Sequence, residues 1–277
     1  MKKTLLLLLA LAPSVAFADN CRYEADRNLD LARDGAKGVD FELASVDIEI
    51  EGVPGMAGIE VRGRACASEQ ARLDEMTLEQ RRDGDRVVVV ARVGKHGNFS
   101  WSGNQNTGFR LRVRMPTDLA AAIDASSGDA RVKHIAALDF DASSGDLVVS
   151  DVPGDVSLSL SSGDVRAERI GPLTVRKISS GDLTARDVRG DARVGSMSSG
   201  DVRLDDVRGA VTIERAGSGD ITLREIGRDV KIGPVGSGDV DIDGVGGDLS
   251  LVSRRDDEDV HYRHVAGKVT FGGRAAD

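Results

Sequence analysis

The residues with the most chemical potential in this sequence are carboxylates that recur at nearly constant spacing. The tripeptide Ser-Gly-Asp occurs seven times, with its aspartates at Asp129, Asp146, Asp164, Asp182, Asp201, Asp220 and Asp239. Successive aspartates are 17, 18, 18, 19, 19 and 19 residues apart. Stacked about 4.8 Å apart, such carboxylates would repel by ~0.9 kcal/mol per neighbouring pair even at the dielectric constant of water. Something in the structure must offset this repulsion.

Two interpretations of the aspartate row are open. Calcium is one, because Gly- and Asp-rich turns of nonapeptide β-rolls bind it, and Asp164, Asp182, Asp201 and Asp220 would then be ligands. In those turns Asp precedes the buried aliphatic residue by two positions, whereas here the aliphatic residue directly follows Asp. The other interpretation is that each Asp accepts hydrogen bonds from backbone N–H groups of its own turn. We favour the structural interpretation and predict no metal and no other cofactor.

Residue patterns typical of enzymes are absent. The four histidines are His96, His134, His261 and His264. His261 and His264 lie three apart on an expected strand, hence on opposite faces, which is the wrong geometry for a shared metal. No Gly-x-Ser-x-Gly or Ser-x-x-Lys sequence frames a nucleophile. We therefore predict no catalytic residues and no enzymatic activity. The alternative is a carbohydrate-active β-helix enzyme acting on an envelope or extracellular polysaccharide.

A second charged row follows four residues after the motif aspartates. Its members alternate in sign along the chain: Glu168, Arg186, Asp205, Arg224, Asp243 and Arg263. Opposite charges on adjacent strands stabilise a sheet modestly, and like charges destabilise it. The row therefore indicates a solvated wall that fixes strand register, and not a groove for a ligand.

The repeat that carries these rows predicts the fold. After Asp201, the apolar residues Val202, Leu204 and Val207 alternate with polar ones, as in a strand with one buried face. A second strand with Val211 and Ile213 follows the corner at Gly209. One unit cannot bury its apolar face alone, but stacked units can. We predict an all-β parallel β-helix, or solenoid, with coils of 17–20 residues. The pattern points Leu204, Ile213, Leu223 and Ile232 inward.

The repeat also suggests boundaries. We expect the solenoid to occupy residues 109–277, ending in a degenerate eighth coil after Asp259, where Val260, Tyr262 and Val265 keep the phase of earlier coils. Terminal coils of solenoids are commonly atypical because they cap the core. Upstream apolar segments are irregularly spaced, so we expect residues 19–108 to form a less regular β region that caps the N-terminal end of the same domain.

An Arg-rich strand from Phe109 to Arg114 ends in Met115-Pro116, and an Ala-rich strand then leads into the Ser-Gly-Asp coils. This arrangement resembles a bacterial family of exported β-strand-repeat proteins, a domain of unknown function whose members are labelled candidate adhesins. The resemblance covers roughly residues 39 to 271. It implies a β-helix and a surface or envelope setting.

The N-terminus predicts export. A basic start at Lys2 and Lys3, an apolar run from Leu5 to Leu11 and the triplet Ala16-Phe17-Ala18 form a signal peptide over residues 1–18, cleaved after Ala18. The charged Asp19 disfavours lipid attachment at the nearby cysteine. We therefore expect a periplasmic, secreted or cell-surface protein. In an oxidising compartment, the two cysteines, Cys21 and Cys66, are expected to form a disulfide.

Charge and composition restrict the partners. The formal net charge is -9, and it becomes -11 when the two lysines of the signal peptide are removed. This balance opposes binding to nucleic acid or to anionic membranes, and no second apolar stretch is long enough for stable membrane insertion. The expected partner is an envelope or surface protein or polysaccharide. The candidate binding loop contains Phe99, Trp101, Asn104 and Gln105. Alternatively, its two aromatic residues plug the solenoid.

Overall fold

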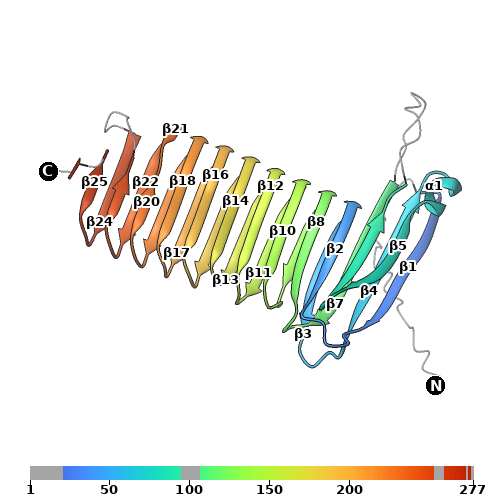
Figure 1. Cartoon of the computed structure of the whole chain (residues 1–277). Coiled ribbons are helices and arrows are strands. Elements are labelled where there is room, and N and C mark those ends of the chain that lie inside the picture. The colour runs from blue at the N-terminus through green and yellow to red at the C-terminus, as the bar shows by residue number, and fades with distance from the viewer. Residues whose placement is uncertain (1–20, 95–106, 253–258, 273, 276–277) are drawn as a thin grey trace, which may run out of the picture.

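The protein is an elongated, flattened coil of two facing β-sheets (Figure 1). The computed structural model describes residues 21–94, 107–252, 259–272 and 274–275. The expected signal peptide and the loop residues Phe99, Trp101, Asn104 and Gln105 lie outside the described residues. Within the described residues nearly every element is a strand, which confirms the predicted all-β parallel solenoid.

The first sheet, sheet A, has 12 strands in the described residues. In spatial order they are β1 (Tyr23–Ala32), β4 (Gly58–Ala67), β7 (Thr107–Pro116), β3 (Asp47–Val53), β9 (Ala130–Lys133), β11 (Leu147–Val152), β13 (Val165–Ile170), β15 (Leu183–Val188), β17 (Val202–Val207), β19 (Ile221–Ile226), β22 (Val240–Val245) and β24 (Val260–Val265).

The second sheet, sheet B, has 14 strands in the same part of the chain. In spatial order they are β26 (Arg274–Ala275), β25 (Val269–Phe271), β23 (Leu249–Leu251), β20 (Val230–Ile232), β18 (Val211–Ser218), β16 (Ala192–Ser199), β14 (Leu173–Ser180), β12 (Val156–Ser162), β10 (Leu138–Ser144), β8 (Ala120–Ser127), β2 (Gly38–Ser45), β6 (Arg86–Arg92) and β5 (Thr77–Asp83). The fourteenth strand, the short β21 (Val235–Ser237), lies outside this order and pairs with β18.

One regular coil consists of a sheet B strand, a Ser-Gly-Asp corner, a sheet A strand and a second corner. Each strand pairs in parallel with its counterpart in the next coil, so that Leu204 of β17 lies opposite Leu223 of β19. The inward residues Leu204, Ile213, Leu223 and Ile232 are completely buried, as the alternation predicts. No charged side chain is buried among the described residues. The core is therefore a narrow, dry aliphatic stack.

A left-handed residue near the end of each sheet A strand from β9 to β24 changes the alternation. Asp206 has φ 55°, and the same place in other coils is taken by His134, Asp151, Arg169, Asp187, Glu225, Gly244 and His264, all with positive φ. Such a conformation is uncommon for residues other than glycine. Because it inserts one extra residue into the strand, both Leu204 and the later Val207 face the core. This backbone feature explains why the apolar spacing lengthens from two residues to three.

The parallel ladders begin before the expected start at residue 109. Strand β2 pairs in parallel with β8, and β3 pairs in parallel with both β7 and β9. Residues 38–53 therefore form a coil, although they lie inside the stretch expected to be an irregular cap. Its corner is Ser45-Val46-Asp47, in which valine occupies the glycine position. That substitution hid the coil from a search for Ser-Gly-Asp.

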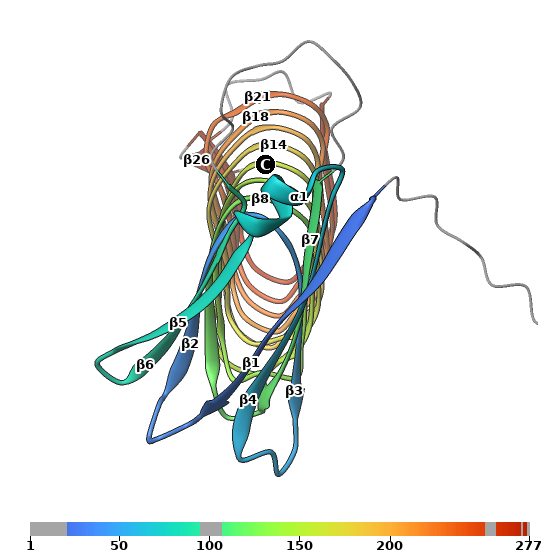
Figure 2. The ribbon, with the colours of Figure 1, turned by 90° about the vertical axis from the view of Figure 1, so that its right-hand side faces the viewer.

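Antiparallel strands and one short helix close the N-terminal end. Strand β1 pairs antiparallel with β4, β4 with β7, and β5 with β6. Seen end-on, the coils superpose as nested ovals, and the helix α1 (Gln70–Asp74) lies between the strands of the two sheets (Figure 2). Its Leu73 and the following Met76 join the core cluster. Arg27 of β1 donates hydrogen bonds to the carbonyls of both residues, which ties the helix to sheet A.

The expected degenerate coil is present at the C-terminal end. Strand β24 pairs in parallel with β22, and β25 with β23. Tyr262 and Phe271 come from the two sheets, and their ring centroids are 5.7 Å apart. Phe271 packs against the core, whereas Tyr262 is exposed. Among the described residues, no helix is long and apolar enough to cross a membrane.

Candidate functional site

The Ser-Gly-Asp corners bring successive backbones very close together. Gly200 has φ 113°, a conformation that strains any other residue. A Cβ atom on Gly200 would lie closer than 3.0 Å to the carbonyl oxygen of Gly181, one coil earlier. The glycine amide donates to the carbonyl of Ser218, one coil later, at 3.0 Å. Glycine is therefore required for two separate reasons, conformation and close stacking.

The motif aspartates bond to the neighbouring coil and not to their own turn. Oδ1 of Asp201 accepts a hydrogen bond from the backbone N–H of Asp220 at 2.8 Å. The same contact links the pairs Asp47–Asp129, Asp129–Asp146, Asp146–Asp164, Asp164–Asp182, Asp182–Asp201 and Asp220–Asp239. The expectation of contacts within one turn was wrong, because stacking presents the next corner's N–H to each carboxylate. These N–H dipoles offset the repulsion along the row.

The four aspartates of the calcium alternative belong to this row. Asp164, Asp182, Asp201 and Asp220 each use one carboxylate oxygen for the next coil's amide. Among the described residues, no group of histidine, cysteine, aspartate and glutamate side chains has a geometry that could hold a metal ion. The geometry of the row is thus that of a structural ladder of side-chain to backbone bonds.

The alternating charged row stands in register along the outer face of sheet A. Arg186 lies opposite Asp205, and the two side chains approach to 3.3 Å. At the C-terminal end, the Asp243 carboxylate contacts Arg263 and His264, each at 2.7 Å. The hydrogen bond from Arg263, followed by that from His264, lowers the pKa of Asp243 to about 2. In the same manner, Arg169 lowers the pKa of Asp151. These contacts are those of the expected solvated wall.

A shallow pocket of about 240 Å³ lies on this wall near the C-terminal end. Its polar lining includes Thr222, Arg224, Asp241, Asp243 and His261. Two carboxylates on one strand face resemble the pair that a glycosidase uses, but one member of such a pair must donate a proton and needs a raised pKa. Asp243 has a lowered pKa and is ionised at neutral pH. Asp243 is therefore unsuited to act as the proton donor of such a pair.

A larger groove, of about 560 Å³, lies on the outer face of sheet A at the N-terminal end. It is lined by strands β1, β4 and β7, with the side chains of Glu24, Asp26, Asn28, Arg62, Arg64, Cys66, Arg110 and Arg112. The central strand β4 runs antiparallel to both β1 and β7, so the groove is built by the closing structure and not by the repeat. Among the sequence-predicted site residues, only Cys66 lines it.

The groove interrupts the alternation of charge. Arg62 lies opposite Arg112, and Arg64 lies opposite Arg110, so that two basic rows are adjacent. Like charges directly opposite one another destabilise a strand pair. Everywhere along the regular charged row the sign changes from one strand to the next. The double row of arginines thus follows a different rule from the wall.

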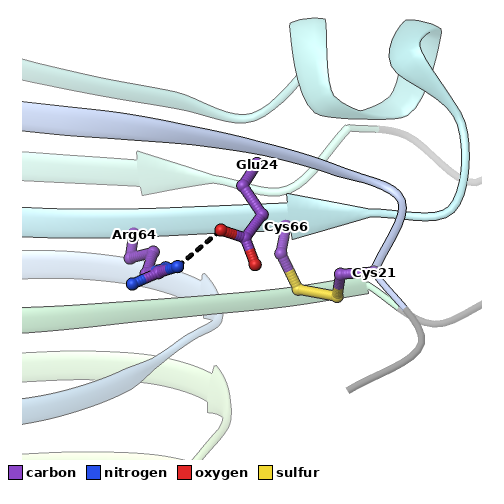
Figure 3. The surroundings of a disulfide bond; sticks show 4 residues. All are labelled: Cys21, Glu24, Arg64 and Cys66. Carbon is purple, nitrogen blue, oxygen red and sulfur yellow. Dashed lines mark hydrogen bonds and ion pairs between the residues drawn. A yellow bond between two sulfur atoms is a disulfide. The ribbon is translucent and has the colours of Figure 1, made fainter. Parts of the chain in front are cut away.

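The arginines of the two basic rows differ in the hydrogen bonds that their side chains make. On β4, Arg62 and Arg64 turn toward β1, with Arg62 at 2.5 Å from Asp30 and Arg64 at 2.5 Å from Glu24. The hydrogen bond to Glu24 raises the pKa of Arg64 (Figure 3). On β7, Arg110 and Arg112 make no side-chain hydrogen bond within the described part of the chain.

The nearest carboxylates to the β7 arginines lie on β3. Asp47 is 3.7 Å from Arg110, and Glu49 is 3.6 Å from Arg112. The two arginine side chains are 66% and 74% exposed. The β7 guanidinium groups therefore face carboxylates on one side at ion-pair distance and remain largely exposed to solvent. No local sequence pattern indicates this arrangement. The alternation of Arg110, Arg112 and Arg114 marks an exposed strand face, but the pairing of β7 with β4 joins residues that are 40 to 54 positions apart in the chain.

A disulfide lies at one end of the groove. It joins Cys21 to Cys66, with 5.5 Å between the Cα atoms (Figure 3). The bridge spans 45 residues and fixes the beginning of β1 beside the end of β4. The groove wall that carries Glu24 is thereby tied covalently to the strand that carries Arg64.

Several solved structures are similar to this chain. A candidate cell adhesion protein from Clostridium sporogenes is 12% identical, with 73% of this chain and 99% of that chain covered and a TM-score of 0.37. A candidate lipid binding protein from Parabacteroides distasonis is 11% identical, with coverages of 91% and 95% and a TM-score of 0.44. A candidate adhesin from Bacteroides fragilis is 12% identical, with coverages of 91% and 98% and a TM-score of 0.39.

No curated protein matches the chain significantly. The family described as Toastrack DUF4097 matches residues 39–232. This segment runs from the first coil, at β2, to the sixth Ser-Gly-Asp coil, at β20. It spans more than half of the 277 residues. The chain therefore belongs to the Toastrack DUF4097 family.

Proposed function

We propose that this protein is a non-catalytic binding module that works outside the cytoplasm, in the cell envelope or at the cell surface. The predicted signal peptide over residues 1–18 supports export. The disulfide between Cys21 and Cys66 supports the same location, because such bonds persist in oxidising compartments. Its partner is an envelope or surface polymer, either protein or polysaccharide.

One observation carries the binding function: in the groove on β1, β4 and β7 two rows of arginines are adjacent, which interrupts the alternation of charge along the wall. A surface selected only for register would oppose each arginine with a carboxylate, as the regular row does. In the groove, Arg110 and Arg112 of β7 have an arginine opposite them on β4 as well as a carboxylate on β3, and both side chains remain largely exposed. The candidate loop with Phe99, Trp101, Asn104 and Gln105 lies outside the described residues. It remains a second proposed contact.

The carbohydrate-active enzyme is less well supported. Its mechanism needs a carboxylic acid that is protonated at working pH, close to a second carboxylate. The carboxylate pair in the C-terminal pocket includes Asp243, whose pKa is lowered to about 2 by Arg263 and His264. Asp243 is therefore not the proton donor that this mechanism needs.

The test uses protein purified after export. Isolated envelope polysaccharide and cell-wall fractions are mixed with the protein, and co-sedimentation is measured together with the release of reducing sugar ends. We expect co-sedimentation without new reducing ends. Release of reducing ends at a steady rate would favour the enzyme. If the protein sediments with none of the fractions, the proposed binding module is contradicted. Trp101→Ala is measured in parallel, and loss of sedimentation in that variant would assign the contact to the loop.

A further inference from the structure

We propose that the groove over β4 is a binding site for an anionic polymer, which Arg110 and Arg112 hold through its phosphate or carboxylate groups. This inference rests on the proposed function and names the chemistry of its ligand. It assigns the site to the antiparallel strands at the N-terminal end, and not to the Ser-Gly-Asp coils.

The two arginines of β7 are placed to contact two charges on one chain. Arg110 and Arg112 alternate with inward residues, so both project from the same face of the strand. Their Cα atoms are about 6.8 Å apart in an extended strand. Each guanidinium has five N–H donors in a planar fork that matches the oxygens of a carboxylate or phosphate. In the described part of the chain, neither side chain uses these donors for a hydrogen bond.

The arginines of β4 complete the basic floor without competing for the ligand. Arg62 donates to the carbonyls of Leu29 and Val61 as well as to Asp30. Arg64 is held by Glu24. These contacts fix both guanidinium groups beside the exposed arginines of β7. A bound anion between the strands would turn two like-charge pairs into charge-assisted contacts.

The acidic margins of the groove indicate how a ligand lies in it. Asp26 of β1 lines one side of the groove, opposite Arg64. Asp47 and Glu49 of β3 stand on the other side, beyond β7. A polyanion crossing the strands would meet carboxylates at both margins. A polyanion running parallel to β4 and β7 stays over the arginines.

The solvent exposure of the groove and the positive charge of its arginines restrict the class of ligand. An exposed ion pair is weak in water, so a single small anion gains little here, whereas a polymer sums several contacts. Nucleic acid is the less favoured polyanion, because the described residues that line the groove include no aromatic side chain for base stacking. An acidic polysaccharide or a phosphate-containing envelope polymer fits the described residues better.

The experiment measures binding of four probes to the exported protein by titration calorimetry: polyphosphate, polygalacturonate, neutral dextran and single-stranded DNA. The groove variant is Arg110→Ser with Arg112→Ser. The matched control is Arg166→Ser with Arg193→Ser, which removes the same charge from exposed positions elsewhere on the two sheets. Thermal melts and a thiol assay verify that both variants are folded and disulfide-linked.

We expect polyphosphate or polygalacturonate to bind, dextran not to bind, and added salt to weaken the interaction. The groove variant should lose at least tenfold in affinity, and the control should stay within twofold of the wild type. Arg110→Lys with Arg112→Lys should lose affinity partially, because lysine keeps the charge but not the fork. A preference for polyphosphate or for polygalacturonate distinguishes phosphate from carboxylate as the recognised group.

Equal losses in groove and control variants would overturn the site, as would tighter binding of DNA than of either acidic polymer. Envelope co-sedimentation separates the two proposals. If the groove variant still sediments like the wild type, the groove inference fails and the binding module stands. If the wild type itself does not sediment, the proposed function fails.

Discussion

At the scale of single residues, the motif glycine separates conformational strain from steric collision. Gly200→Ala forces a Cβ both into a positive φ and against the carbonyl of Gly181. Gly55, in the turn after β3, has φ 74° but no atom within 4 Å of an added Cβ. We expect Gly55→Ala to cost about 1 kcal/mol and Gly200→Ala to cost clearly more. Urea unfolding measures the free energy of unfolding of both variants. Equal losses would show that neighbouring coils can move apart to accept the Cβ atom without a loss of stability.

The motif aspartate tests the structural ladder against calcium binding. Asp201→Asn keeps the oxygen that accepts the N–H of Asp220 and removes one charge from the row, so stability should be nearly unchanged. Asp201→Ala leaves that N–H without its acceptor and should cost ~1 kcal/mol. Melting curves with and without calcium measure the difference. A large calcium-induced rise in the wild-type melting temperature that Asp201→Asn abolishes would establish the calcium alternative.

Asp243 gives the wall a defined pH dependence. Its folded pKa of about 2 is below its ordinary value of 3.8, because the ionised form contacts Arg263 and His264. Its contribution to stability is therefore complete above pH 3.8 and is lost as the pH falls through about 2. Asp243→Asn should flatten the stability profile in that window. Arg263→Gln should raise the carboxyl pKa in an NMR titration, and an unchanged pKa would contradict the assigned cause.

At the scale of elements, the disulfide holds an edge strand that the repeat does not support. Strand β1 pairs only with β4 in sheet A, and its inward residues are half-buried. Replacing both cysteines by serine should cost about 2–4 kcal/mol. Hydrogen exchange should then increase in β1 and leave β17 unaffected, because the coils contact only their neighbours. Two free thiols in the exported wild-type protein would contradict the bridge.

The elements divide into those that local pattern predicts and those that it does not. The apolar residues Val202, Leu204 and Val207 keep a fixed phase to Asp201, so each coil strand follows from the chain alone. The left-handed Asp206 does not follow, because backbone strain there is compensated by packing of the whole stack. The hidden coil at Ser45-Val46-Asp47 lacks the glycine that marks the others.

The candidate site was beyond prediction for a related reason. Its charges become a groove only when β1, β4 and β7 are adjacent, and no short-range pattern brings Glu24, Arg64 and Arg110 together. Antiparallel partners that are far apart in sequence are set by competition among many possible pairings. The row of Asp205 and Asp243 was readable because the repeat itself fixes its register.

At the scale of the whole molecule, the stack behaves as a one-dimensional array. Leu223 is completely buried, and it lies between Leu204 and Ile242 of the adjacent coils. Leu223→Ala should cost ~2–5 kcal/mol, because neither neighbouring coil can collapse into the gap. Thr222→Ala, on the outward face of the same strand, should be nearly neutral in the same urea titration. A cost below 1 kcal/mol for Leu223→Ala would mean that the core is not close-packed.

The repeated bonding of successive Ser-Gly-Asp corners has a consequence for how such a gene can change. In these corners the Asp carboxylate accepts the backbone N–H of the next coil's Asp, and glycine occupies the same position in each coil. A tandem duplication of nineteen codons would therefore insert one coil that fits both neighbours. Such an insertion lengthens the stack by about 4.8 Å and leaves the groove at one end and the aromatic pair at the other unaltered. The distance between the two ends is thus set by the number of coils in the gene, and it can change in evolution by one coil at a time.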